Sequence, residues 1–169
     1  MATSSSPLSV GGTAPAFRAP TSNGQTLDSD AYLLKLPVAL FFVDGVEDPD
    51  DQLLISAFDA LLPQFGELRI QLLGVVPLTA KAARDYAESR FLALTLLADE
   101  DRSITDAYCG APGAVDAHSV IVDRLGTVAA IVPRREVREH AADLLATARR
   151  ARARDSRVSP IAGPARPAQ

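Results

Sequence analysis

An acidic loop is the part of the sequence whose residue types and spacing most readily suggest chemistry. Residues 44–51 read Asp-Gly-Val-Glu-Asp-Pro-Asp-Asp and follow a short apolar run. Helix capping is the interpretation that accounts for most of these residues. In it, Asp48 is the N-cap, Pro49 is the first helical residue, and Asp50 and Asp51 are anions that face the positive end of the helix.

A divalent-cation site is the weaker alternative for this loop. Clustered carboxylate oxygens suit hard cations, and the candidate ligands are Asp44, Glu47, Asp48 and Asp51. The loop lacks the spacing and the closing glutamate of a helix-loop-helix calcium site. We therefore expect neither a bound metal nor a cofactor.

Cys109, the single cysteine of the chain, is the second candidate for chemistry. A lone cysteine allows no disulfide within the chain and no two-cysteine redox cycle. The simpler interpretation is a small, semi-buried residue, and the alternative is a reactive or regulatory thiol. No basic residue lies within four positions on either side to lower the pKa of this thiol, so we expect ordinary thiol reactivity.

The histidines and arginines give weaker signals. Neither His118 nor His140 has a cysteine or carboxylate at metal-ligand spacing, and we expect His140 to be a solvent-exposed helical residue. Eight arginines near the end of the chain are expected to form the solvated face and basic end of a terminal helix. They are Arg134, Arg135, Arg138, Arg149, Arg150, Arg152, Arg154 and Arg157. Nucleic-acid binding is not expected, because the rest of the chain is acidic and the tail has no aromatic residues for stacking.

The elements that must hold these residues alternate between strand and helix patterns. The run 38–43 is apolar throughout, as in a strand buried on both faces. Apolar residues at helical spacing follow from Pro49 to Leu62, where Pro63 and Gly66 break the pattern. Further strands are expected at 68–76 and 94–97, further helices at 79–90 and 136–152, and an antiparallel hairpin at 119–122 and 127–132. This order predicts an α/β fold with a mixed central sheet flanked by helices on both faces.

Length and composition fit one globular domain. The chain has 169 residues, of which 47% are hydrophobic and 22% are charged, unlike wholly disordered or membrane-spanning chains. We expect a flexible N-terminus at 1–11, the domain at 12–152 and a disordered Pro/Ala/Arg-rich tail at 153–169. The first residues show neither the basic start nor the apolar core of a signal sequence, which favours a cytoplasmic location.

Five short motifs occur in order between residues 12 and 132. They are Gly12-Thr13-Ala14-Pro15-Ala16-Phe17 followed by Asn23-Gly24, then Phe41-Phe42, Leu96-Leu97-Ala98-Asp99, Tyr108-Cys109-Gly110, and Val120-Ile121-Val122-Asp123 followed by Gly126. In order and spacing they resemble the peroxiredoxins of the AhpC/TSA family, especially the bacterioferritin-comigratory subgroup. The resemblance implies a thioredoxin-like fold, thiol-dependent peroxide reduction and self-association as a homodimer.

The resemblance also implies where the family's reactive residues would fall. The family's loop reads P-x-x-x-T-x-x-C, which places Asp44 at the proline, Asp48 at the threonine and Asp51 at the peroxidatic cysteine. The family's arginine falls on Ala117. All four positions are changed, so the thiol and the guanidinium that hold and cleave a peroxide are missing.

Two functions follow as expectations. The first is a catalytically degenerate peroxiredoxin-like protein that acts as a binding or regulatory module, with a second copy or another protein as its partner. The second is a thiol-dependent oxidoreductase, an antioxidant peroxidase that uses Cys109 and an external reductant. The substitutions favour the first, and family membership favours the second.

Overall fold

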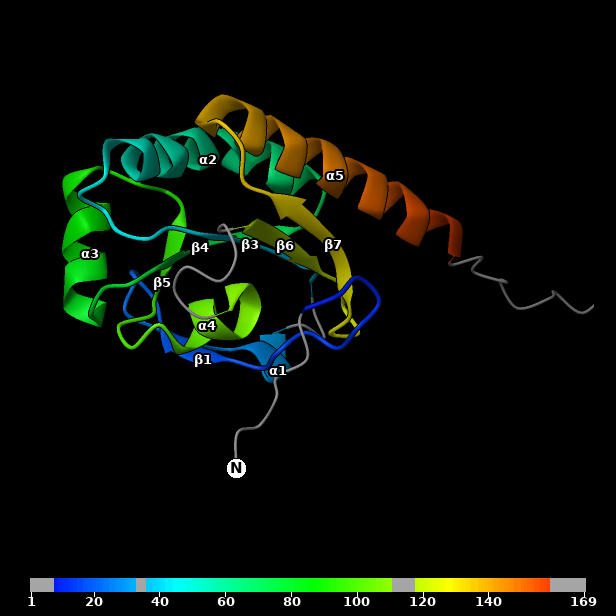
Figure 1. Cartoon of the computed structure of the whole chain (residues 1–169), viewed down its shortest axis with the longest axis horizontal. Helices are drawn as coiled ribbons and strands as arrows, with labels where there is room; N and C mark the ends of the chain where they lie inside the picture. Colours follow the sequence, from blue (N-terminus) through cyan, green and yellow to red (C-terminus); the bar gives the residue numbers. More distant parts are fainter. Residues whose placement is uncertain (1–7, 33–35, 111–117, 159–169) are drawn as a thin grey trace, which may run out of the picture.

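The computed structural model of the chain describes residues 8–32, 36–110 and 118–158 (Figure 1). Its sheet strands are β3 (Val38–Phe42), β4 (Gln71–Val76), β5 (Thr95–Ala98), β6 (His118–Val122) and β7 (Val128–Pro133). They form one mixed sheet in the order β5-β4-β3-β6-β7. β3, β4 and β5 run parallel, whereas β6 is antiparallel to both β3 and β7. The predicted α/β architecture of thioredoxin-like type is confirmed.

Helices cover both faces of this sheet. α2 (Pro49–Glu67), α3 (Ala80–Ser89) and α5 (Val137–Val158) contribute to the core on one face. α4 (Ser103–Cys109) and the N-terminal segment contribute to the core on the other (Figure 1). Within the described residues, no helix is both long enough and apolar enough to cross a membrane.

The strand β3 divides its side chains between the two cores. Phe41 belongs to the core under α2, whereas Leu40 and Phe42 belong to the core that includes α4. This alternation follows from the strand geometry, in which successive side chains point to opposite faces. All five residues of β3 are buried, as the apolar run predicted.

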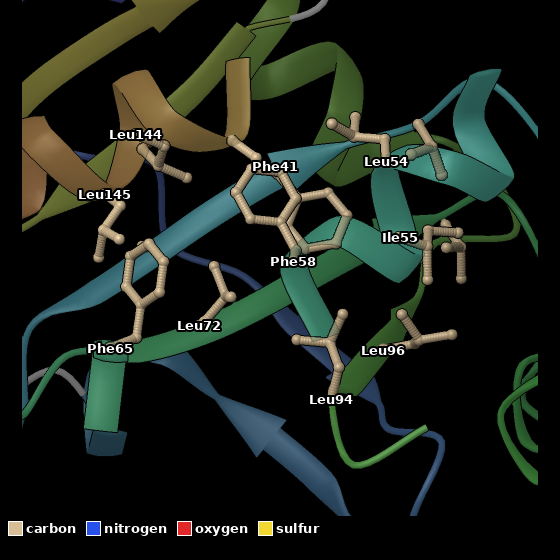
Figure 2. Packing of buried hydrophobic residues seen from close by; sticks show 14 of the residues in the cluster. Phe41, Leu54, Ile55, Phe58, Phe65, Leu72, Leu94, Leu96, Leu144 and Leu145 are labelled. Carbon is tan, nitrogen blue, oxygen red and sulfur yellow. The ribbon is translucent and has the colours of Figure 1, made fainter. Parts of the chain in front are cut away.

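Aromatic packing joins β3 to α2. The rings of Phe41 and Phe58 stack with their centroids 4.3 Å apart, at the centre of the larger core (Figure 2). Phe41 also lies against Gly74 of β4, where an added Cβ would be 2.6 Å from the ring. This contact requires a glycine in the neighbouring strand. The packing thereby fixes the two elements between which the acidic loop runs.

The helix α2 is longer than the sequence predicted, because it continues through Pro63 to Glu67. Proline removes one backbone hydrogen bond from a helix interior. The following Phe65 is fully buried in the core, so we attribute the continuation to the packing of this last turn. The helix is capped at Leu68, and the next residue, Arg69, has a φ of 54° and turns the chain toward β4.

The N-terminal hairpin and the end of α5 also differ from expectation. β1 (Arg18–Pro20) and β2 (Thr26–Asp28) form an antiparallel pair that the sequence did not predict, followed by the short α1 (Ser29–Tyr32). α5 continues past its expected end at Arg152 as far as Val158. Residues 153–158 are therefore helical and not part of a disordered tail. Of the N-terminus predicted at 1–11, residues 8–11 are described, and the Gly11 N–H donates to the Val128 carbonyl at 2.8 Å. Residues 1–7 and 159–169 lie outside the described residues.

Candidate functional site

The acidic loop leads into α2 through the predicted cap. Asp48 is the N-cap, with extended backbone angles, and its Oδ1 accepts a hydrogen bond from the Asp50 N–H at 2.8 Å. Pro49 is the first helical residue, where its missing N–H costs nothing. The capping interpretation is confirmed for these residues, and it places Asp51 in the first turn of the helix.

The Asp51 carboxylate is the centre of the site. The residue is 1% exposed, and its Oδ2 accepts hydrogen bonds from the N–H groups of Asp44 at 3.0 Å and Gly45 at 3.2 Å. Its Oδ1 accepts a hydrogen bond from the guanidinium of Arg134, with which it forms an ion pair. Two backbone donors, a cation and the positive end of α2 therefore surround one buried anion.

Arg134 is the functional residue that the sequence analysis missed. It was assigned to the solvated arginines, and that assignment is wrong, because its side chain is only 23% exposed and reaches Asp51. The sheet explains its position. β6 runs antiparallel to β3, and β7 runs antiparallel to β6, so β7 ends at the edge where β3 ends. The predicted hairpin already contained this signal, since Arg134 follows its second strand.

Ala117, the expected position of the family's arginine, lies outside the described residues. His118, the next residue, pairs with Pro133 in the β6–β7 register. Arg134 directly follows Pro133, so it lies at the same edge of the sheet as His118. A guanidinium is present at this edge of the sheet, but it comes from the neighbouring strand.

His140 is buried and supports the chain next to Arg134. The residue is 2% exposed, its Nδ1 lies 3.1 Å from the Pro133 carbonyl oxygen, and its Nε2 lies 2.7 Å from the hydroxyl of the buried Ser119. The arrangement fits a neutral ring in which Nδ1–H donates to Pro133 and Nε2 accepts from Ser119. Burial lowers the pKa of His140, and the nearby charge of Arg134 acts in the same direction.

The expected exposure of His140 is therefore wrong. Its spacing of three residues from Val137 and four from Leu144 already placed it on the apolar face of α5. Exposure was predicted from the polar side chain of histidine and not from its position on the helix. The structure instead satisfies both ring nitrogens within the core.

Cys109 lies at the end of α4, away from α2. It is 6% exposed and packs in the core that contains Phe42 and Tyr108. Burial raises the pKa of the Cys109 thiol, and the charges of Asp44 and Asp106 raise it further. The His118 N–H and the Arg102 guanidinium oppose this change. Local sequence showed no cation near Cys109, but the fold brings Arg102 close enough to act on it.

The four carboxylates of the cation hypothesis do not converge. Asp51 faces Arg134 and two N–H groups, Asp48 caps α2, and Asp44 lies 3.6 Å from the Arg102 guanidinium. Across residues 8–32, 36–110 and 118–158, the structure assembles no group of three or more His, Cys, Asp or Glu residues that could hold a metal ion. Capping and ion-pair contacts account for Asp44, Asp48 and Asp51.

Comparison with known proteins places this geometry in a family. The model described as "AhpC/TSA family" matches residues 10–131. The chain is 24% identical over 147 residues to a Coxiella burnetii protein named as a peroxiredoxin bcp, a match that covers 82% of this chain and 97% of the relative. More than half of the chain therefore matches the family.

Solved structures share the fold. Peroxidoxin BcpB from Mycobacterium tuberculosis is similar with a TM-score of 0.74 and 23% identity, over 85% of this chain and 97% of that one. The reduced 2-Cys peroxiredoxin of Plasmodium vivax is similar with a TM-score of 0.76 and 19% identity, over 87% of this chain and 98% of that one. By sequence and by fold, the chain belongs to the AhpC/TSA family and is peroxiredoxin-like.

Proposed function

We propose that this chain is a catalytically degenerate peroxiredoxin-like protein that serves as a binding or regulatory module. The proposal rests on the burial of Asp51 and its ion pair with Arg134. Asp51 stands where the resemblance places the peroxidatic cysteine. The position that would react with a peroxide is occupied by an oxygen anion whose lone pairs already accept three donors.

The chemistry of peroxide reduction explains why this substitution matters. A thiolate sulfur gives an electron pair to one peroxide oxygen, and the O–O bond breaks. The sulfur is left as a sulfenic acid, and the other oxygen leaves after taking a proton. A carboxylate oxygen is a far weaker nucleophile, and hydrogen bonds from three donors weaken it further. We infer that Asp51 does not perform this step.

The surroundings of Asp51 support the same conclusion. A helix N-terminus and a guanidinium are the features that lower the pKa of a reactive cysteine. Here both act on a carboxylate, and Arg134 is engaged in an ion pair with it. The site therefore keeps the electropositive surroundings of a thiolate site but uses them to hold Asp51. The Asp51–Arg134 ion pair thereby connects the helix after the acidic loop to the segment after β7.

The alternative function, a thiol-dependent oxidoreductase that uses Cys109, has less support. The residue is buried, and burial raises the pKa of its thiol, which lowers the fraction of reactive thiolate at neutral pH. The chain has no second cysteine to resolve a sulfenic acid. An external reductant would have to reach a residue packed in the core.

A peroxide-consumption assay on the purified chain separates the two functions. We expect no consumption of hydrogen peroxide above the rate of the added thiol reductant alone. The matched control is Cys109→Ser. Turnover by the parent that disappears in Cys109→Ser would replace the proposal with the oxidoreductase alternative.

Self-association and location complete the proposal. The family resemblance supports a homodimer, and we place the protein in the cytoplasm. Sedimentation velocity over a range of protein concentrations tests the first point, and cell fractionation tests the second. A sedimenting species with the mass of one chain at every concentration would contradict the dimer.

A further inference from the structure

A groove lies between the C-terminal half of α5 and the sheet, at the edge opposite Asp51. Its volume is about 360 Å³. Ile70, Ile121 and Ala130 line it from the sheet side, and Ala151 lines it from α5. The Asp123–Gly126 turn borders it with Leu125, which is 87% exposed. Apolar lining in a concave space of this size is typical of small-ligand sites.

The acidic and the basic side chains around the groove differ in whether they already have charged or hydrogen-bonding partners in the protein. Asp155 already pairs with Arg152 at 3.0 Å and with Arg124 at 3.7 Å. Asp123 accepts hydrogen bonds from the N–H groups of Leu125 at 2.9 Å and Thr127 at 3.0 Å. Both acidic groups of the lining are therefore occupied by partners within the protein.

Within the described part of the chain, two guanidiniums at the rim have no carboxylate partner. Arg150 donates to the hydroxyl of Thr147 at 3.0 Å, and neither Arg150 nor Arg154 forms an ion pair with any described residue. Both residues line the groove and are exposed. The ligand that complements this site carries a negative charge at one end and apolar surface at the other.

We propose that the groove binds a free anionic amphiphile, a medium-chain alkyl carboxylate. The alkyl chain lies along Ile121, Ala130 and Ala151, and the carboxylate accepts hydrogen bonds from Arg150 and Arg154. The groove is at the opposite edge of the sheet from Asp51, so this inference does not rest on the loss of catalysis. It supplies a ligand class for a binding function.

The test uses decanoate and the full chain, with amide chemical shifts and calorimetry as the two readouts. Decanoate is expected to bind at one site and to shift the amides of the groove. Acetate lacks the alkyl chain, and decyltrimethylammonium carries the opposite charge, so we expect neither to bind there. Equal binding of either probe would overturn the proposal.

Three variants locate the site. Arg154→Glu is expected to weaken decanoate binding about fivefold or more, as expected for the loss of one charge contact. Ala151→Leu fills the groove from a helical position and is expected to abolish binding while the circular dichroism spectrum stays unchanged. Arg149→Glu is the matched control, because it makes the same charge change on an exposed residue that does not line the groove. An equal loss in Arg149→Glu would show a general charge effect and overturn the proposal.

Two further outcomes would also contradict it. Shifts of the groove amides on protein dilution without ligand would show that a second copy occupies the groove. Binding to phosphatidylglycerol vesicles that Ala151→Leu abolishes, without binding of monomeric decanoate, would show a membrane surface as the ligand.

Discussion

A reactive cysteine needs a sulfur and surroundings that stabilise its thiolate. In this chain Asp51 has such surroundings and Cys109 has the sulfur. At Asp51 the surroundings are present, namely a helix N-terminus, two loop N–H groups and the Arg134 guanidinium, but the side chain has no sulfur. At Cys109 the sulfur is present, but burial raises its pKa. Reactivity depends on a residue and its surroundings together, and this chain holds the two on opposite faces of its sheet.

Removing the Asp51 carboxylate is expected to change the stability of the fold more than any other substitution considered. Asp51→Ala leaves a partly buried guanidinium and two N–H groups without their acceptor, so we expect a loss of about 3 kcal/mol in the free energy of unfolding. Urea denaturation measures it. The matched control is Asp85→Ala, which breaks the exposed Lys81–Asp85 pair with its N···O distance of 2.6 Å. That loss should be much smaller, and similar losses in both variants would show that Asp51 is no more than a surface contact.

The second prediction moves the sulfur to the favourable surroundings. In Asp51→Cys with Cys109→Ser, the new thiol would face Arg134 and the N–H groups that now bind Asp51. We expect its pKa to lie below that of an ordinary cysteine and its thiolate to be about tenfold more populated at pH 7. Thiolate absorbance near 240 nm, followed against pH, measures this without a reagent that must enter the site.

The Arg134 guanidinium is expected to contribute most to that lower pKa, because among the described residues it is the one full positive charge facing the position. Adding Arg134→Gln to the same variant should return the pKa of the new thiol toward the ordinary range. A thiol that titrates like Cys109 in the presence of Arg134 would mean that the acidic residues of the loop outweigh the guanidinium.

The sequence predicts those features of the site that depend on neighbouring residues, and it misses those that depend on contacts between distant segments. The buried strand β3, the cap at Asp48 and the position of Asp51 follow from neighbouring residues, and the structure agrees. The Asp51–Arg134 pair joins residues 83 positions apart, so it depends on the order of strands in the sheet. The extension of α2 through Pro63 depends on tertiary packing, which propensity does not contain.

A third prediction concerns His140, which supports the chain beside Arg134. Because burial lowers its pKa in the folded state, the unfolded chain binds a proton more readily. The stabilisation from the neutral ring is complete above the unfolded pKa of about 6.5 and is lost as the pH falls below that value. We expect the free energy of unfolding to fall between pH 7 and pH 5.5 by about 1 kcal/mol or less.

His140→Asn is the matched variant for this pH dependence. Its amide can donate to the Pro133 carbonyl without titrating in this range. The slope between pH 7 and pH 5.5 should then be smaller than in the parent. An unchanged slope would assign the dependence to other groups.

Oxygen uptake by the parent chain tests directly whether it reduces peroxides, because a thiol that reduces a peroxide takes up one of its oxygen atoms. Here we expect no change at all. The measurement is intact mass spectrometry of the parent chain after brief exposure to dilute hydrogen peroxide near neutral pH, with Cys109→Ser alongside. We expect no gain of oxygen beyond that of Cys109→Ser, because Asp51 carries no sulfur and burial keeps the Cys109 thiol protonated. Prompt addition of one oxygen to the parent but not to Cys109→Ser would contradict the account, since it would give this chain a working peroxide-reducing thiol.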